Sequence, residues 1–138
     1  MKKVLIFAIA GFLLNTASAQ STDEKEDYTV VLPDKAQSCV LPAAPDAIPA
    51  DANYDQMITA KKNVADFQSM LGTYRDCLKA AEDGTPDLTA GNKQALVASY
   101  NYSVDMEEWV ADRFNEAVCT YKKGTWVTEN GKGTCKKD

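Results

Sequence analysis

The sequence predicts an all-α domain, an antiparallel two-helix hairpin that is coiled-coil-like, with an extended Pro-rich strap on its N-terminal side and a small C-terminal β-ribbon. Two long segments with an apolar residue at every third or fourth position predict the helices. Three prolines between residues 41 and 50 predict the strap. Four cysteines predict two disulfides, which would tether the strap and the ribbon to the helices.

The first 19 residues have the pattern of a secretory signal peptide. Lys2 and Lys3 precede an apolar run over residues 4–14, and Ala17-Ser18-Ala19 supplies the small-x-small triplet of a cleavage site. The run is shorter than the roughly 20 residues that a membrane-spanning helix needs. We therefore expect a periplasmic or secreted protein, without a membrane anchor, whose mature chain begins at Gln20.

The mature chain has the length of one domain. We divide the sequence into the signal peptide (1–19), a flexible N-terminal lead with a short strand at 28–32 (20–38), and a disulfide-stapled helical hairpin domain (39–138). Loss of Lys2 and Lys3 changes the formal net charge from −5 to −7. This acidic balance disfavours binding to nucleic acid or to anionic lipid.

The strap and the first helix follow the lead. Prolines at positions 42, 45 and 49 of LPAAPDAIPA disfavour a helix and favour an extended path. The first helix is expected to begin near Asn53, with Gln56 completing a capping box, and to end near Ala81, before a left-handed Gly84. Its predicted apolar face consists of Met57, Ala60, Val64, Phe67, Leu71, Tyr74, Leu78 and Ala81.

The second helix is expected to start at Thr85-Pro86-Asp87, which offers a cap, a first-turn proline and a favourable charge. Lys122-Lys123-Gly124 should end it. Glu107 interrupts its apolar seam, and we expect it to pair with Lys61 of the first helix. The predicted seam consists of Ala90, Val97, Tyr100, Val104, Ala111, Phe114, Val118 and Tyr121. Beyond the helix, Asn130-Gly131 is a favoured hairpin turn and predicts the two-stranded ribbon.

The geometry of this hairpin restricts the disulfides. A turn centred near residue 84 places Cys77 and Cys119 roughly 42 Å apart along the helices, far beyond the ~6 Å between bridged Cα atoms. The strap from Cys39 to the first helix reaches up to ~43 Å, which is enough to return along the ~36 Å to Cys77. We therefore expect Cys39–Cys77 and Cys119–Cys135. The alternative, Cys39 with Cys119 or Cys135, requires bent or broken helices.

Catalytic signatures are missing from the sequence. The chain has no histidine and no CxxC pair, which excludes the usual zinc sites, thioredoxin-like motifs and catalytic Ser-His or Cys-His pairs. We therefore expect no enzyme, no catalytic residue, no metal and no cofactor. An alternative is a metal-assisted enzyme that uses Asp105, Glu108 and Asp112, although a solvated acidic helix face is the simpler explanation, since no calcium-loop pattern accompanies them.

Tyr102, Met106 and Trp109 form a second apolar stripe on the second helix. Either the strap, residues 28–32 or the ribbon with Trp126 covers this stripe, or the stripe contacts an unknown protein partner or a second copy of the chain. The main hypothesis is a non-enzymatic protein–protein interaction module that acts through the stripe. A carrier of a small apolar ligand is the other alternative.

One series of residues has a characteristic order: Cys39, Ile48-Pro49, Met57, Phe67, Tyr74-Arg75-Asp76-Cys77-Leu78 and Phe114-Asn115-Glu116-Ala117. This order resembles a group of small exported proteins predicted from proteobacterial genomes, which have no assigned activity. The resemblance covers about residues 39–122 and implies a helical hairpin and export. It transfers no functional site, and the tail with Cys119 and Cys135 departs from the pattern.

Overall fold

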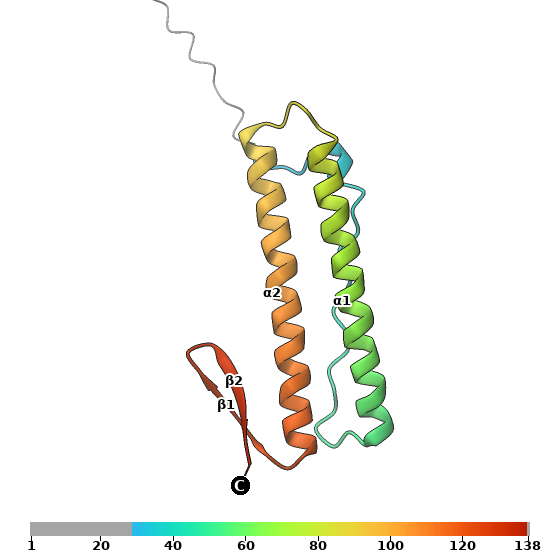
Figure 1. Cartoon of the computed structure of the whole chain (residues 1–138), viewed down its shortest axis with the longest axis vertical. Helices are drawn as coiled ribbons and strands as arrows, with labels where there is room; N and C mark the ends of the chain where they lie inside the picture. The colour runs from blue at the N-terminus through green and yellow to red at the C-terminus, as the bar shows by residue number, and fades with distance from the viewer. Residues whose placement is uncertain (1–28, 138) are drawn as a thin grey trace, which may run out of the picture.

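A computed structural model describes residues 29–137 of the chain; the expected signal peptide (1–19) and the lead up to residue 28 lie outside these residues. Two long helices, α1 (Tyr54–Asp83) and α2 (Ala90–Tyr121), run antiparallel and side by side (Figure 1). A short 3-10 helix, η1 (Asp34–Ala36), precedes them, and strands β1 (Thr125–Glu129) and β2 (Lys132–Lys136) form an antiparallel ribbon after them. The predicted helical hairpin and the predicted ribbon are confirmed.

The start of α1 is the predicted one, but its end differs. The backbone N–H of Gln56 donates to Asn53 Oδ1 at 3.0 Å, and the backbone N–H of Asn53 donates to Gln56 Oε1 at 2.8 Å. These two bonds make the expected capping box. Gly84 has φ −85°, so the left-handed conformation expected there is wrong. Side chains bind the terminal carbonyl oxygens instead: Thr85 Oγ1 donates to Ala81 at 2.8 Å, and Lys35 Nζ donates to Gly84.

The predicted start of α2 at Thr85-Pro86-Asp87 is wrong, because the helix begins at Ala90. Thr89 is its N-cap and forms a capping box with Asn92. The backbone N–H of Asn92 donates to Thr89 Oγ1 at 3.1 Å. Leu88, just before the cap, packs against buried residues of both helices. Burial of Leu88 and the second capping box therefore outweigh the helix-starting tendency of Pro86, and the connection is longer than expected.

The buried face of α1 matches the prediction, whereas that of α2 is rotated. On α1, Phe67, Leu71 and Leu78 are almost completely buried. On α2, the predicted seam residues Val97, Tyr100 and Tyr121 remain exposed, and the residues that face α1 recur every seventh position: Leu96, Ser103 and Val110. The prediction placed α2 against α1 alone. In the structure the N-terminal segment packs against the pair as a third layer, and α2 turns part of its surface toward that segment.

The longer connection also changes the partner of Glu107. Its carboxylate lies 2.8 Å from Nη1 of Arg75, not beside Lys61 as predicted. The two side chains are only 19% and 29% exposed, and the guanidinium also lies 6.0 Å from the centre of the Tyr100 ring. An ion pair in such a partly buried place favours one alignment of the helices over others.

The core consists of two clusters. The turn-end cluster joins Ala36, Tyr74, Leu78, Ala81 and Leu96 next to the connection between the helices. The middle cluster joins Phe67, Leu71 and Val110. Leu41 of the Pro-rich segment packs against both clusters. Residues 37–53, which contain the Pro-rich segment, form neither helix nor strand, and in Figure 1 this segment passes behind the helices.

The described part of the expected flexible lead is packed onto the hairpin. Residues 29–32 contain no strand, contrary to the prediction, and Ala36 of η1 is fully buried. The side-chain amide of Asn92 donates to the Val31 carbonyl at 2.7 Å. A Cβ at Gly91 would overlap the Thr29 carbonyl, so only glycine permits this close approach of the segment to α2.

Two disulfides join the outer segments to the helices, with the predicted pairing. The Cα atoms of Cys39 and Cys77 lie 5.7 Å apart, and those of Cys119 and Cys135 lie 5.6 Å apart. Asn130 and Gly131 have φ angles of 53° and 76°, as a type I′ hairpin turn requires, so the predicted turn of the ribbon is confirmed. The disulfides indicate an oxidising, periplasmic or extracellular environment. Neither helix within residues 29–137 has the length and apolar character that a membrane span requires.

Candidate functional site

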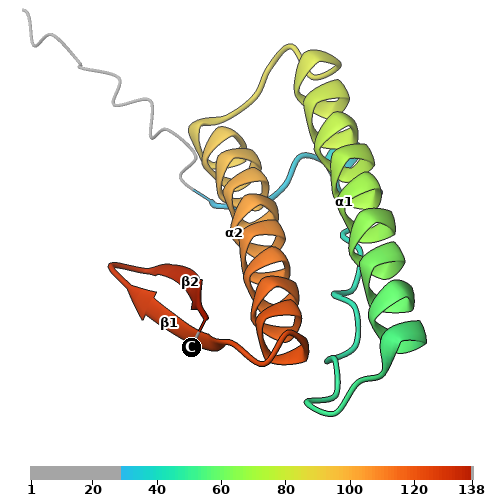
Figure 2. The same cartoon turned by 60° about the horizontal axis from the view of Figure 1, so that its bottom comes forward.

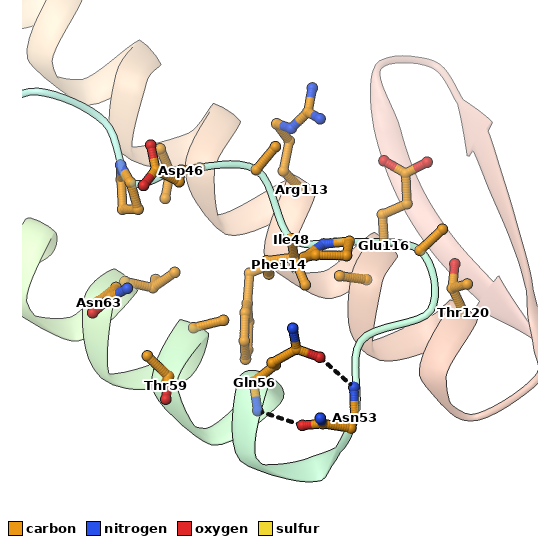
Figure 3. Close-up of a pocket in the computed structure, with 18 of the residues that line it drawn as sticks. Asp46, Ile48, Asn53, Gln56, Thr59, Asn63, Arg113, Phe114, Glu116 and Thr120 are labelled. Atoms are coloured by element: carbon orange, nitrogen blue, oxygen red, sulfur yellow. Dashed lines mark hydrogen bonds between the residues drawn. The ribbon is translucent and has the colours of Figure 1, made fainter.

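The candidate site is a groove at the open end of the hairpin, where α1 begins and α2 ends. Its volume is about 780 Å³. Three segments form its walls: residues 45–50 of the Pro-rich segment, the N-terminal turns of α1, and the C-terminal half of α2 (Figures 2 and 3). The disulfide Cys39–Cys77 and the capping box of α1 fix the two ends of the Pro-rich wall.

The middle of the groove is apolar. Figure 3 shows Phe114 of α2 projecting into the space between the Pro-rich segment and α1, next to Ile48. Both side chains are half-buried, so part of each faces the groove. The other apolar residues of the lining are Ala60, Val64, Trp109, Val110 and Ala117, together with the alanines and prolines of residues 45–50.

The charged residues of the lining are mainly acidic. Carboxylates come from Asp46 of the Pro-rich segment, Asp55 of α1 and Glu116 of α2. The positive charge of the lining is Arg113, whose guanidinium lies 5.1 Å from the centre of the Trp109 ring. This is a cation–π contact, in which the electron-rich face of the indole ring attracts the guanidinium. The carboxylates therefore dominate the charge at the groove.

The structure divides the predicted Tyr102/Met106/Trp109 stripe. Met106 is half-buried and packs against the middle cluster of Phe67, Leu71 and Val110. Tyr102 and Trp109 remain 55% and 52% exposed. Trp109 lies at the edge of the groove, while Tyr102 does not line it. Met106 thus contributes to the packing of the hairpin, and the two aromatic residues are the more accessible part of the stripe.

The acidic side chains Asp105, Glu108 and Asp112 are exposed on α2. Among residues 29–137, no group of three or more Cys, Asp or Glu side chains is arranged to hold a metal ion. All four cysteines are in disulfides, so the chain offers no thiol nucleophile.

Sequence reasoning missed the groove because it assigned Ala60, Val64 and Phe114 to the sealed seam between the helices. These three residues are only half-buried. The signal was the composition of the Pro-rich segment: in residues 42–50 the only large apolar side chain is Ile48, and the other residues are Pro, Ala and Asp. Such a segment covers a helix pair with its main chain and short side chains, and it leaves the space beneath unfilled.

Comparison of the chain with protein-family models, with curated proteins and with solved structures found no match. The chemistry of the groove therefore rests on its own side chains. An apolar middle can hold a hydrocarbon or aromatic body. The carboxylates and the side chains of Thr59, Asn63 and Thr120 can fix the orientation of a polar or positively charged group at its edge.

Proposed function

We propose that this protein is an exported, non-enzymatic binding protein that holds a small amphiphilic molecule in the open-end groove. The observation that carries the proposal is the groove itself. Its volume of about 780 Å³ is within the range of roughly 300–1,000 Å³ that is typical of small-molecule sites. An apolar middle with polar groups at the edge is the usual composition of such sites.

The charges of the lining favour a ligand with a positive or neutral head group. The apolar body would lie against Ile48, Val110 and Phe114. The head group would lie near the carboxylates of Asp46, Asp55 or Glu116. An anionic head group would meet these carboxylates, while Arg113 is already stacked on Trp109.

Export is part of the proposal. The pattern of residues 1–19 and the two disulfides support a periplasmic or secreted protein. The resemblance to small exported proteobacterial proteins points the same way. In this setting the Pro-rich segment acts as a strap that Cys39–Cys77 holds over a coiled-coil-like helix pair, in which Leu96, Ser103 and Val110 repeat every seven residues.

A fluorescence titration tests the proposal. The chain has two tryptophans, so the variant Trp126→Phe retains only Trp109, at the edge of the groove. We expect dodecylamine, below the concentration at which it forms micelles, to shift the Trp109 emission in a saturable manner. Dodecanoate, which has the same chain length and the opposite charge, should bind at least about tenfold more weakly.

Two pairs of variants on this background locate the binding. Phe114→Ala should weaken dodecylamine binding, whereas Tyr102→Ala, an aromatic residue of α2 outside the groove, should not. Glu116→Gln should weaken it, whereas Glu108→Gln, which removes the same charge elsewhere on α2, should not. A Trp109 emission that does not respond to either amphiphile, or that responds equally in Phe114→Ala, would refute the proposal.

A second candidate function is contact with a protein partner through Tyr102 and Trp109, because both aromatic side chains are about half exposed. This contact would use the accessible part of the predicted stripe. Tyr102→Ala separates the two functions: it should abolish capture of a partner from the native compartment and leave the dodecylamine titration unchanged. If Tyr102→Ala and Trp109→Ala capture the same proteins as the wild type, the second candidate is wrong.

A further inference from the structure

The hairpin has two broad faces, and the described segments cover only one of them. The Pro-rich segment passes behind the helices in Figure 1, and the groove, with Trp109 and Arg113, is on that side. The position after a helical residue lies about 100° further around the axis and the position before it about 100° back. Since Trp109 precedes the buried Val110 and lies on the covered side, Ala111 faces the opposite side, which we call the open face.

Apolar residues of α2 follow one line along the open face. Val97, Val104 and Ala111 each come directly after a buried residue, namely Leu96, Ser103 and Val110. Val97 is 59% exposed and Tyr100, which lies between two of these positions, is 48% exposed. We call this line the α2 stripe: Val97, Tyr100, Val104, Ala111 and Val118. The sequence has the spacing of a buried seam here, yet within residues 29–137 the stripe is left partly uncovered.

The α2 stripe is complementary to itself in the antiparallel direction. Val97 and Val118 are equally distant from the midpoint between Glu107 and Glu108, and so are Val104 and Ala111. Two copies of α2 related by a twofold axis at this midpoint would place Val97 of one copy opposite Val118 of the other, and Val104 opposite Ala111. Such reciprocal pairing is the property of a twofold interface, in which one patch binds its own copy.

Of the two glutamates beside the proposed twofold axis, Glu107 is already paired within each copy, while Glu108 is exposed. Glu107 lies 2.8 Å from Arg75, and both side chains are mostly buried. Burying an ion pair that exists beforehand costs much less than burying a lone carboxylate. On α1, the open face also contains Gly72, where an added Cβ would point into open space.

The available area is sufficient for a dimer. The stripe from Val97 to Val118 extends over about 32 Å at 1.5 Å per residue, and two packed helices present a face roughly 20 Å wide. Two such faces bury about 1,200 Å² in total, which is at the lower limit of specific interfaces. We infer that the α2 stripe binds a second copy of this chain, and that the resulting antiparallel four-helix dimer dissociates in the micromolar range.

Sedimentation equilibrium of the disulfide-bonded mature chain, across the micromolar range, tests the inference. We expect a reversible monomer–dimer equilibrium. Val104→Glu should weaken dimerisation at least about tenfold, because a lone carboxylate becomes buried in the contact. Val97→Glu, at the more exposed end of the stripe, provides the same test without a risk to folding, and Trp109→Ala on the covered face serves as a control that should dimerise as the wild type does.

The register of the contact has its own test. Ala111→Lys alone should also weaken dimerisation, and the double variant Val104→Glu/Ala111→Lys should restore it, because each glutamate then faces a lysine of the other copy. A wild type that is monomeric throughout the micromolar range would overturn the inference. A dimer that Val97→Glu and Val104→Glu leave unchanged, or that Trp109→Ala abolishes, would overturn it as well. None of these results depends on the groove, so they neither support nor contradict the proposed binding of an amphiphile.

Discussion

The two ends of the hairpin contain the same kind of helix face but are filled differently. At the turn end, Tyr74, Leu78 and Leu96 are buried, and side chains from three other segments complete the packing, among them Ala36 of η1 and Leu88 of the connection. At the open end, Ala60, Val64 and Phe114 have comparable apolar character but stay half-buried around the groove. The difference lies in what covers the helices, not in the helices themselves.

This difference explains how so small a chain forms a groove. Two helices bury only a narrow line of side chains between them, so a third layer must fill the space on either side. At the turn end, η1 and the connection supply this layer, and Leu41 extends it to the middle cluster. At the open end, the Pro-rich segment bridges the helices with short side chains. These side chains do not fill the space beneath the segment, and the unfilled space is the groove.

The largest expected effect contrasts two phenylalanines. Phe67→Ala, in the fully packed middle cluster, should lower the free energy of unfolding by about 3–5 kcal/mol. Phe114→Ala should cost less than about half of that, because its ring already borders an open groove. Urea denaturation of both variants measures the two losses. Equal losses would mean that the open end is packed as tightly as the middle of the hairpin.

The two disulfides provide the next contrast. Replacing Cys39 and Cys77 by serine should cost about 4 kcal/mol, since the bridge closes a separation of 38 residues, and replacing Cys119 and Cys135 about 3 kcal/mol for 16 residues. Only the first change frees the Pro-rich wall, so only it should abolish the dodecylamine response of Trp109. Loss of the response in the second variant alone would show that the ribbon, not the Pro-rich segment, maintains the groove.

A smaller effect is expected for the ion pair between the helices. A double-mutant cycle with Arg75→Met and Glu107→Gln should give a coupling of about 1 kcal/mol, because both side chains are mostly shielded from water. The exposed pair Lys79–Asp83 is the matched control and should give less than about 0.5 kcal/mol. Equal coupling energies for the two pairs would contradict a role of Arg75 and Glu107 in fixing the alignment of the two helices.

The smallest effects concern two helical glycines. Gly72→Ala should raise the free energy of unfolding by up to about 1 kcal/mol, since alanine favours a helix and nothing lies near the added Cβ. Gly91→Ala should lose this gain, because the new methyl group displaces the Thr29 carbonyl. Thermal unfolding compares the two variants, and limited proteolysis should detect release of residues 29–31 only in Gly91→Ala. An equal gain in the free energy of unfolding in both variants would contradict the close contact of residues 29–31 with Gly91.

Local signals in the sequence were sufficient for part of the fold. Asn53 and Gln56 defined the start of α1, Asn130-Gly131 defined the turn of the ribbon, and reach along the helices selected the disulfide partners. The start and rotation of α2 were beyond such signals. Both depend on tertiary contacts: Leu88 joins the turn-end cluster, and the N-terminal segment takes up part of the surface of α2.

The candidate site shows the same limit. The sequence left open whether Tyr102, Met106 and Trp109 are covered. Trp109 is exposed and Met106 packs against the middle cluster, and helical spacing alone does not separate the two because it does not reveal a third layer. The groove itself depends on an absence of side-chain volume over residues 42–50, and hydrophobic patterns do not report missing volume. Composition of a covering segment is the feature that would have indicated it.

Amide hydrogen exchange, with and without dodecylamine, tests the contrast between the two ends most directly. We expect the slowest exchange around Tyr74 and Leu78 of α1 and Leu96 of α2, unchanged by the amphiphile. We expect faster exchange over residues 45–64 and 109–120, and slower exchange there once dodecylamine is bound. Uniform protection along both helices, or an effect of dodecylamine confined to the turn end, would contradict a sealed turn end and an open, ligand-binding groove.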